Sequence, residues 1–327
     1  MPDPVLIVIP CLNEAAHLDA LISALLAEAG PDDRLAIADG GSTDGSLKIV
    51  DRWGARDARV RLVRNPARLQ SAGVNAAVSA HGRGRAWIVR VDAHARYPQG
   101  YVARLLAAAE ATGADSVVVP MRTVGGGCFQ QAAATAQNSA IGAGGSAHRV
   151  GGASRWIDHG HHALMRREAF AAIGGYNADF SHNEDAEFDL RLAASGGRIW
   201  FQGDLAIDYV PRRTPAALLR QYMNHGRGRA RTVRLHRTPL KLRQLAPAGV
   251  APAVAAGVLG AAGALLHPAS LILAAPALLW LAACLVGGAA AAAASRAPTC
   301  GYASGFAAMI MHLGWSCGFL RGLAAFR

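Results

Sequence analysis

The first 240 or so residues alternate short apolar runs with longer stretches in which apolar positions recur at helical spacing. Such alternation predicts βαβ units and a mostly parallel sheet, an α/β fold. We expect strands at 5–10, 60–66, 87–91 and 116–121, and at the start of 34–46, where a strand runs into a polar, glycine-rich turn. We expect helices at 17–30, 46–55, 71–80 and 100–114. Ligands of such sheets bind beyond the carboxyl ends of the strands, and Asp39 and Asp92 both lie at such ends.

The middle of the chain is less regular. Residues 122–160 are rich in Gly and Ala and predict a loop-bearing insertion. A second ordered stretch follows over 161–212, and the segment 214–244 then carries many Arg and Lys residues and no acidic residue.

Three uncharged runs follow, at 245–266, 268–294 and 300–320, the last with one His. Each reaches the roughly 20 residues that a membrane-spanning helix needs. A buried Ala-rich hairpin of a soluble domain is the alternative, and the third run could instead lie in the membrane interface. The basic segment before Leu245 is expected on the cytoplasmic side, as is Arg296. Arg321 and Arg327 would lie outside if all three runs span, which leaves the topology open.

The composition agrees with a membrane partner. The chain has 327 residues, 52% hydrophobic and 17% charged, with a formal net charge of +11 and a pI near 10.2. Such a chain suits nucleic acid or an anionic membrane surface. Aromatic residues, at 6%, are sparse for stacking on bases, and the apolar excess gathers in the tail, so we expect a membrane and no nucleic acid.

The cysteines and the N-terminus indicate a cytoplasmic setting. The five cysteines are odd in number, and no two have Cys-x-x-Cys spacing, so we expect all of them to be reduced. The first residues lack a basic segment, and their apolar run is too short for a signal peptide.

Three acidic stretches could carry chemistry. Asp39, before Gly40-Gly41-Ser42-Thr43-Asp44-Gly45, brings a carboxylate to a turn where backbone can approach a ligand, whereas Asp44 is as readily a helix cap. Asp92-Ala93-His94 places an oxygen and an imidazole nitrogen where both could reach one divalent ion, although a solvated strand end is commoner. In 182–191, four carboxylates fall in six positions; Asp185 and Asp189 would share a helix face and Glu187 could pair with Arg191. One of these carboxylates could be a general base, or the stretch could be a charged helix start.

Two further stretches are basic. Asp158-His159-Gly160-His161-His162 lacks zinc-like spacing, so acceptor or phosphate contacts are at least as reasonable as metal binding. In 221–229, guanidinium groups beside glycines could grip a diphosphate, or form a polybasic membrane patch. Both readings can hold if Arg227 and Arg229 point inward while residues 231, 234 and 241 face lipid.

The order of these motifs resembles the family 2 glycosyltransferases. The motifs are Ile-Pro-Cys-Leu-Asn-Glu (9–14), Asp-Gly-Gly-Ser-Thr-Asp-Gly-Ser (39–46), Asp-Ala-His (92–94), and Gly-Gly-Tyr (174–176) leading to Asn-Glu-Asp (183–185). The stretches VDAHARYP, DHGHHAL, NEDAEFDLRL and QYMNHGRGRA resemble more closely the membrane-associated glucosyltransferases of succinoglycan-type exopolysaccharide synthesis.

The resemblance implies a fold and a division of the chain. The fold is GT-A, a Rossmann-like catalytic domain with a mostly parallel sheet, followed by C-terminal transmembrane helices. The catalytic domain would cover 1–240, with a nucleotide-binding half at 1–121 and an acceptor half with the basic segment at 122–240. A membrane region of two or three helices would cover 245–327.

The resemblance also implies site residues. Asp185 matches the catalytic base and Asp92 the first position of the Asp-x-Asp metal motif, whose last position is held here by His94 instead of Asp; the ion would be Mg²⁺ or Mn²⁺. Asp39 matches the aspartate that contacts uracil. The remaining candidates for substrate or nucleotide binding are Pro10, Asn13, Glu14, Asn75, His161, His162, Glu184, Gln221, Arg227 and Arg229. No Trp follows the last three, which departs from the Gln-x-x-Arg-Trp motif of processive synthases.

The expected activity is inverting transfer of a sugar from a UDP-sugar to a saccharide on a polyprenyl diphosphate lipid. The sugar is expected to be glucose, and the product a bacterial exopolysaccharide. The enzyme would sit at the inner membrane, with its catalytic domain facing the cytoplasm. The alternatives are a relative of processive polysaccharide synthases and a catalytically inactive membrane-bound sugar-nucleotide-binding protein.

Overall fold

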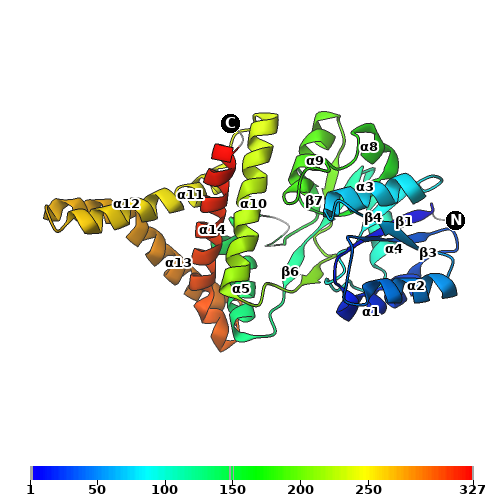
Figure 1. Cartoon of the computed structure of the whole chain (residues 1–327), viewed down its shortest axis with the longest axis horizontal. Coiled ribbons are helices and arrows are strands. Elements are labelled where there is room, and N and C mark those ends of the chain that lie inside the picture. The colour runs from blue at the N-terminus through cyan, green and yellow to red at the C-terminus, as the bar shows by residue number, and fades with distance from the viewer. Residues whose placement is uncertain (1–2, 147–148, 150, 326–327) are drawn as a thin grey trace. The chain divides into compact units, whose positions relative to one another are not determined.

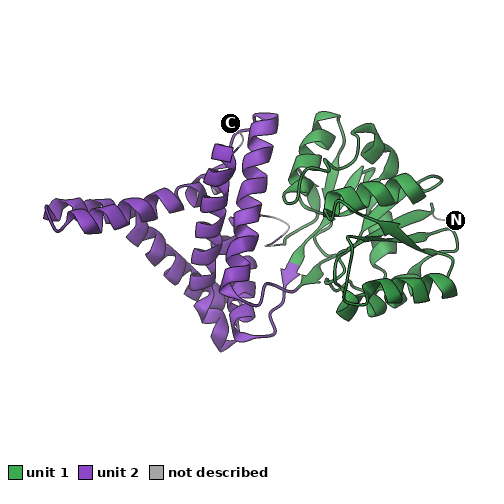
Figure 2. Cartoon of the chain, in the orientation of Figure 1, with its two compact units in different colours: residues 1–121, 151–209 green, residues 122–150, 210–327 purple. Residues whose placement is uncertain are grey.

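The computed structural model describes residues 3–146, 149 and 151–325, and the chain divides into two compact units (Figure 2). The first unit comprises 1–121 and 151–209, and the second comprises 122–150 and 210–327. These bounds differ from the expected residue ranges, because residues 122–150 group with the C-terminal helices.

An eight-stranded sheet forms the centre of the first unit, in the order β3-β2-β1-β4-β8-β5-β9-β7. Its strands are β1 (Val5–Cys11), β2 (Arg34–Asp39), β3 (Val60–Arg64), β4 (Trp87–Arg90), β5 (Ser116–Val119), β7 (Arg155–Ile157), β8 (His161–Arg166) and β9 (Ile199–Phe201). Strands β1 to β4 run parallel, whereas β8 is antiparallel to both β4 and β5, and β7 is antiparallel to β9. The sheet is therefore mixed, with a parallel half that carries the strand ends picked out from the sequence.

The helices of the first unit follow the predicted alternation. They are α1 (Ala15–Glu28), α2 (Ser46–Arg56), α3 (Gln70–His81), α4 (Tyr101–Thr112), α8 (Arg167–Ala172) and α9 (Glu184–Ala194). Strands β1 and β2 are almost wholly buried, as expected for parallel strands that helices cover on both faces. Apolar residues of α1 and α4 pack on the sheet and complete the core. Two short strands, β6 (Met121–Thr123) and β10 (Ile207–Tyr209), lie where the chain leaves the first unit.

The described part of the second unit is mainly helical. Its elements are α5 (Cys128–Gln137), α6 (Ala140–Ala143), α10 (Pro215–His236), α11 (Leu242–Ala248), α12 (Val250–Gly263), η1 (Pro268–Ala274), α13 (Ala275–Ala294), η2 (Thr299–Ala303) and α14 (Ser304–Ala325). The expectation of a loop-bearing insertion at 122–160 was wrong in part. An Ala-rich helix, α5, lies in its first half and contributes Ala132, Ala133 and Ala136 to a core shared with α10, α13 and α14.

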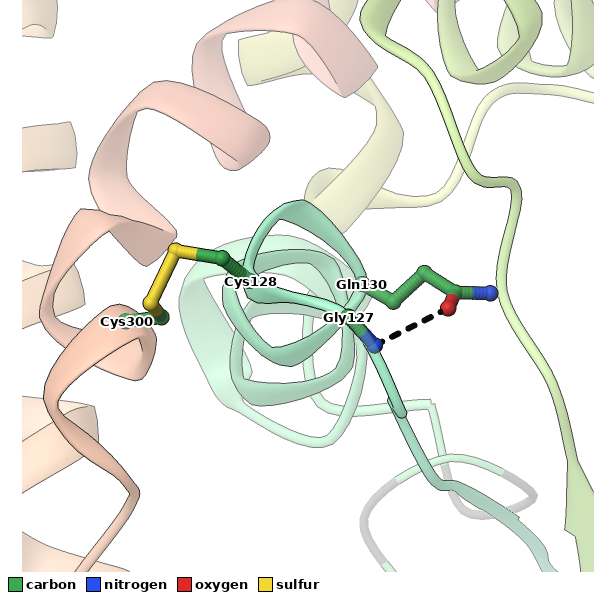
Figure 3. The surroundings of a disulfide bond; sticks show 4 residues. All are labelled: Gly127, Cys128, Gln130 and Cys300. Atoms are coloured by element: carbon green, nitrogen blue, oxygen red, sulfur yellow. Dashed lines mark hydrogen bonds between the residues drawn. A yellow bond between two sulfur atoms is a disulfide. The ribbon is translucent and has the colours of Figure 1, made fainter.

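The cysteine prediction was also wrong for one pair. Cys128, at the start of α5, forms a disulfide with Cys300 of η2 (Figure 3). The two cysteines are 172 residues apart, so no short sequence spacing predicts the pair. They meet because α5 packs against η2. Cys11, Cys284 and Cys317 are free thiols, as expected.

Among the described residues, two stretches are long and apolar enough to cross a membrane. They are Pro268–Ala294 and Thr299–Ala325, with mean hydropathies of 2.3 and 1.2. The first predicted run, 245–266, does not form one long helix. It is divided between α11 and α12 around Gly249, which leaves the 14-residue α12 as a shorter apolar helix.

Candidate active site

The loop after β2 and the start of α1 are joined by side chains that accept backbone N–H groups. The N–H groups of residues 13–15 donate to Ser42 Oγ at 2.8 Å, Ser46 Oγ at 3.0 Å and Asp44 Oδ2 at 2.9 Å. The side chain of Asn13 returns the contact, because its Oδ1 accepts the N–H of Thr43 at 2.8 Å. Asp44 also contacts the helix that it precedes, because its Oδ1 accepts the N–H of Ser46, the first residue of α2, at 3.0 Å. The first two sequence motifs form one hydrogen-bonded surface beside Pro10, at the carboxyl ends of β1 and β2.

Asp39 closes the turn after β2. Its buried carboxylate accepts the N–H of Gly41 at 2.8 Å and that of Ser42 at 3.1 Å. Gly41 has a φ of +87°, a backbone conformation that residues other than Gly rarely adopt. The turn thus keeps the Asp39 carboxylate fixed at the carboxyl end of β2.

Arg90 is the central cation of the first unit, and it was missed in the sequence. Its side chain is only 4% exposed, yet it ends the apolar strand β4. Its Nη1 donates to Asp185 Oδ1, its Nη2 donates to Glu184 Oε1 at 3.3 Å, and its Nε lies 3.7 Å from Asp92 Oδ1. One guanidinium therefore joins the acidic motif after β4 to the acidic motif that begins α9. The signal was available: a charged residue inside the apolar run Trp-Ile-Val-Arg-Val has to be paired when it is buried.

Asp92 lies two residues beyond β4, as predicted. Gln70 Nε2 donates to its Oδ1 at 2.8 Å, and its backbone N–H donates to Tyr97 Oη at 2.6 Å. Its Oδ2 lies 3.8 Å from His161 Nε2. Burial by itself would raise the pKa of the Asp92 carboxyl, but Arg90 and the nearby histidines outweigh burial and hold this pKa below its ordinary value. Asp92 is therefore an anion in the folded protein.

Glu184 and Asp185 begin α9, after Asn183 in the left-handed conformation at φ +67°. Burial, and then the neighbouring Asp185 charge, raise the pKa of the Glu184 carboxyl to about 7. For Asp185, burial acts in the same direction, but Arg90 and then His162 hold its pKa well below the ordinary range. The two adjacent carboxyls thus differ in charge: Asp185 is ionised at neutral pH, whereas Glu184 is close to its titration point.

A buried histidine connects the two acidic turns of α9. His162 Nε2 lies 2.7 Å from Asp189 Oδ1, and its Nδ1 lies 3.5 Å from Asp185 Oδ1 and 2.5 Å from Tyr176 Oη. His159 Nδ1 contacts the other Asp189 oxygen at 2.7 Å. Asp185 and Asp189 therefore share a helix face, as the i, i+4 spacing predicted. A second predicted pair is also confirmed, because Arg191 donates to Glu187 at 2.8 Å.

The family of the chain follows from comparison with known proteins. The family model for glycosyl transferase family 2 matches residues 6–174. The succinoglycan biosynthesis protein ExoA of Rhizobium meliloti is 50% identical over 323 residues, covering 98% of this chain and 96% of that protein. The chain belongs to glycosyltransferase family 2. It is therefore an enzyme, a glycosyltransferase, as the ordered motifs predicted.

Solved structures agree on the fold of this family 2 glycosyltransferase. The mannosyltransferase PcManGT from Pyrobaculum calidifontis, solved with GDP-Man and Mn²⁺, has a TM-score of 0.60 at 20% identity, covering 100% of this chain and 90% of that one. GalNAc-T7, solved with UDP, GalNAc and Mn²⁺, has a TM-score of 0.52 at 14% identity, covering 71% of this chain and 48% of that one. The GT-A prediction is confirmed.

The residues of this site fit a divalent ion whose remaining ligands come from the substrate. Among the described residues, no group of three or more His, Cys, Asp or Glu side chains is arranged to hold a metal. A single ionised carboxylate, Asp92, fits Mg²⁺ or Mn²⁺ ligation in which donor phosphates supply further oxygens. His94 Nδ1 lies 3.0 Å from Glu14 Oε1. Such a carboxylate contact is typical of histidines that bind a metal through the other ring nitrogen.

Asn75 of the glycosyltransferase uses its amide within the protein. Its Nδ2 donates to Tyr176 O at 2.7 Å, and its Oδ1 accepts the Tyr176 N–H at 3.0 Å. It ties α3 to the Gly-Gly-Tyr motif, whose Tyr176 hydroxyl contacts His162. In the structure Asn75 thus helps to position Tyr176 beside His162.

The basic motif of the glycosyltransferase is helical. Gln221, Arg227 and Arg229 lie within α10 of the second unit. A Cβ added at Gly226 would lie 2.1 Å from Trp315 O, so this glycine allows close packing against α14. Of its two arginines, Arg229 is buried and Arg227 is exposed.

Proposed function

We propose that this enzyme transfers a sugar, with inversion, from a UDP-sugar to a lipid-linked saccharide during synthesis of a succinoglycan-type exopolysaccharide. The 50% identity to a succinoglycan biosynthesis protein supports the polymer class. Glucose is proposed as the sugar because the motifs resemble those of succinoglycan-type glucosyltransferases. GDP-Man in one similar structure, and UDP with GalNAc in another, support the donor class. The observation that carries the proposal is that Arg90 lies beside both Asp92 and Asp185. It brings the carboxylate proposed to bind the metal together with the carboxylate proposed to take the acceptor's proton.

Asp185 is the general base in this mechanism. Its ionised carboxylate takes the proton of the acceptor hydroxyl while the hydroxyl oxygen attacks the anomeric carbon. The bond from that carbon to the diphosphate oxygen breaks in the same displacement, and UDP leaves with its electron pair. One displacement from the opposite face inverts the anomeric carbon without a protein nucleophile.

Arg90 and His162 set the state of this base. Arg90 keeps the Asp185 carboxylate charged before the acceptor arrives. His162, held by Asp189 and Tyr176, is a fixed neighbour 3.5 Å from the same oxygen. With His161 also near Asp92 and Asp185, the rigid surroundings orient the carboxylate toward one acceptor hydroxyl.

The donor lies across the ends of β1, β2 and β4 in this proposal. Asp39 binds the uracil, and the joined surface of Pro10, Asn13 and Glu14 supports the nucleotide. Asp92, with His94, would hold Mg²⁺ or Mn²⁺, which would supply positive charge to neutralise the leaving diphosphate. Gln221, Arg227 and Arg229 remain proposed contacts of the diphosphate or of the acceptor's own diphosphate.

The acceptor proposal rests on the apolar part of the chain. A saccharide carried on a polyprenyl diphosphate stays at the membrane, so an enzyme that uses it needs membrane contact. The exposed apolar residues of α12 and α13 supply such a surface. We place the enzyme at the inner membrane, with the first unit in the cytoplasm, where nucleotide sugars are the donors.

The test compares Asp185→Asn with Asp204→Asn, a matched change at an exposed carboxylate paired with Arg104. The purified enzyme is given UDP-glucose, Mg²⁺ or Mn²⁺ and a lipid-linked acceptor, and UDP release and the anomeric configuration of the product are measured. We expect a fall of about 10²–10⁴-fold for Asp185→Asn with donor binding retained, and no change for the control. Near-normal transfer by Asp185→Asn, or a product with retained configuration, would reject the mechanism.

A further inference from the structure

The exposed apolar surface of the second unit is concentrated on one helical hairpin. Helix α12, the short η1 and helix α13 form this hairpin. Its turn extends away from α10 and α14, whereas the carboxyl end of α13 packs against α14 (Figure 1). Its turn is the most exposed part: Leu265 and Leu266 are 89% and 92% exposed, and Ile272 is 75% exposed. The hairpin and its flanks, residues 244–295, contain no Asp, Glu, Lys or Arg. A patch of this kind on a protein surface indicates an apolar partner.

Helix α14 differs from the hairpin, although its length and composition also suit a membrane span. Half of its apolar window is buried inside the protein, against 11% for the α13 window. It packs along α10 through three glycines spaced four residues apart. A Cβ would lie 2.8 Å from Leu219 O at Gly314, 2.0 Å from Met223 O at Gly318 and 3.2 Å from Arg227 Cα at Gly322. The two helices therefore run side by side in the same direction, with their backbones in close contact.

Helix α10 is too basic to enter hydrocarbon with α14. It carries five arginines, at positions 220, 227, 229, 231 and 234. An arginine at the bilayer centre is costly, and five on one helix would have to be buried or paired there. None of the chain's 22 Asp and Glu residues falls within 122–150 or 210–327, so acidic side chains of the second unit do not offset this positive charge. If α14 crossed the membrane, it would take these arginines with it.

The charge of the second unit suits the face of an anionic bilayer instead. It contains fifteen of the chain's 33 Lys and Arg residues. Such a cluster is attracted to anionic lipid headgroups. Arg234 also donates to Leu323 O at 2.6 Å, near the carboxyl end of α14, where a cation is favourable. The pair of α10 and α14 thus has the composition of a surface element and the hairpin that of an inserted one.

We propose that the hairpin of α12 and α13 enters the membrane and returns to the same face, while α10 and α14 remain outside the hydrocarbon on that face. The 14 residues of α12 extend about 21 Å, less than the ~30 Å hydrocarbon core. The uncharged turn at Leu265 and Leu266 suits an end inside the core better than one in water. The occupant of this apolar surface is therefore lipid, and the hairpin does not bring any part of the chain to the far side.

The test labels single cysteines with a membrane-impermeant maleimide in sealed membrane vesicles of either orientation. The variants are Ser295→Cys after α13, Ala325→Cys at the end of α14 and Leu266→Cys at the hairpin turn. Glu110→Cys on α4 marks the side that holds the first unit. All four positions are exposed, so the substitutions leave the packing intact, and the unsubstituted protein measures labelling of native cysteines.

We expect Ser295→Cys and Ala325→Cys to be labelled together with Glu110→Cys, and Leu266→Cys to be labelled from neither side until detergent is added. Protection of Ser295→Cys where Glu110→Cys reacts would show that α13 crosses, and protection of Ala325→Cys would show that α14 crosses. Labelling of Leu266→Cys from the far side would show a spanning hairpin, and from the near side a hairpin outside the membrane. Each of these results would overturn the proposal. The labelling does not depend on sugar transfer, so it can reject this proposal without bearing on the proposed reaction.

Discussion

Arg90 donates a hydrogen bond to Asp185, a residue 95 positions later in the chain. The contact joins the end of β4 to the first turn of α9, and the same guanidinium reaches Glu184 and approaches Asp92. A buried cation thus connects the proposed metal ligand with the proposed base.

Replacing Arg90 should therefore affect both stability and catalysis. Arg90→Met leaves the buried carboxylates without their cation, and we expect a loss of about 3–5 kcal/mol in the free energy of unfolding. Arg90→Lys keeps the charge but not the fork that reaches several partners, so we expect a folded enzyme with kcat reduced at least tenfold. Urea unfolding and steady-state kinetics measure the two effects. Arg166→Lys, at a half-exposed pair with Asp115 in the same sheet, is the control. Wild-type kcat in Arg90→Lys would contradict this role.

The Asp189 and His162 contact should act on the chemical step. Asp189→Asn removes the charge that helps to fix His162 beside Asp185, and we expect kcat to fall about tenfold or more with KM for the donor nearly unchanged. Asp189 also accepts from Gly160 N–H at 3.3 Å, so thermal unfolding is followed in parallel. An equal fall in activity and folded fraction would show a purely structural role.

The raised pKa of Glu184 predicts how stability depends on pH. In the folded protein Glu184 keeps its proton up to a pH of about 7, whereas an unfolded chain loses it near the ordinary value of 4.5. The folded state binds more protons between these values, so the stability contributed by this group is present below pH 4.5 and is lost as the pH rises through 7. Glu184→Gln should remove this fall and raise the melting temperature at pH 8 relative to the parent.

Melting curves of the parent and Glu184→Gln from pH 5 to 8 check this expectation, with Glu110→Gln on the exposed face of α4 as the control. Each kcal/mol corresponds to roughly 2–4 °C in a unit of this size. Parallel curves for the parent and Glu184→Gln would mean that Glu184 does not titrate in this range.

His94 should influence the choice of metal ion. If its ring binds the ion while Glu14 holds Nδ1, His94→Asp shifts the preference from Mn²⁺ toward Mg²⁺, because a carboxylate suits Mg²⁺ better than imidazole does. Activity of the chelator-treated enzyme is titrated with each metal. An unchanged ratio of Mn²⁺ to Mg²⁺ activity in His94→Asp would show that His94 does not contact the metal.

The glycines of α14 should be intolerant of side chains. Gly318→Ala places a Cβ 2.0 Å from Met223 O, so α10 and α14 must separate, and we expect a loss of more than about 2 kcal/mol in stability. Gly249→Ala is the matched control, because its Cβ would lie 3.7 Å from the nearest backbone oxygen. Thermal inactivation in detergent measures both variants, and equal half-lives would contradict the packing account.

Much of the first unit could be predicted because its signals are local. The apolar runs of β1 and β2 and the i, i+4 placement of Asp185 and Asp189 depend on residues that are neighbours in sequence. Arg90 was overlooked because its importance lies in its partners, which are distant in the sequence. The packing role of Gly226 in α10 was overlooked for the same reason, because its neighbour Trp315 on α14 is distant in the sequence.

By itself, the sequence determined the order of strands and helices, the family motifs and the uncharged tail. Periodicity and composition depend only on residues that lie close together along the chain. Only the tertiary structure decided which carboxylates share Arg90, that Cys128 meets Cys300, and that α14 lies against α10. The physical reason is that burial and charge pairing act between residues that sheet and helix packing brings together. The distances between such side chains cannot be predicted from their spacing in the sequence.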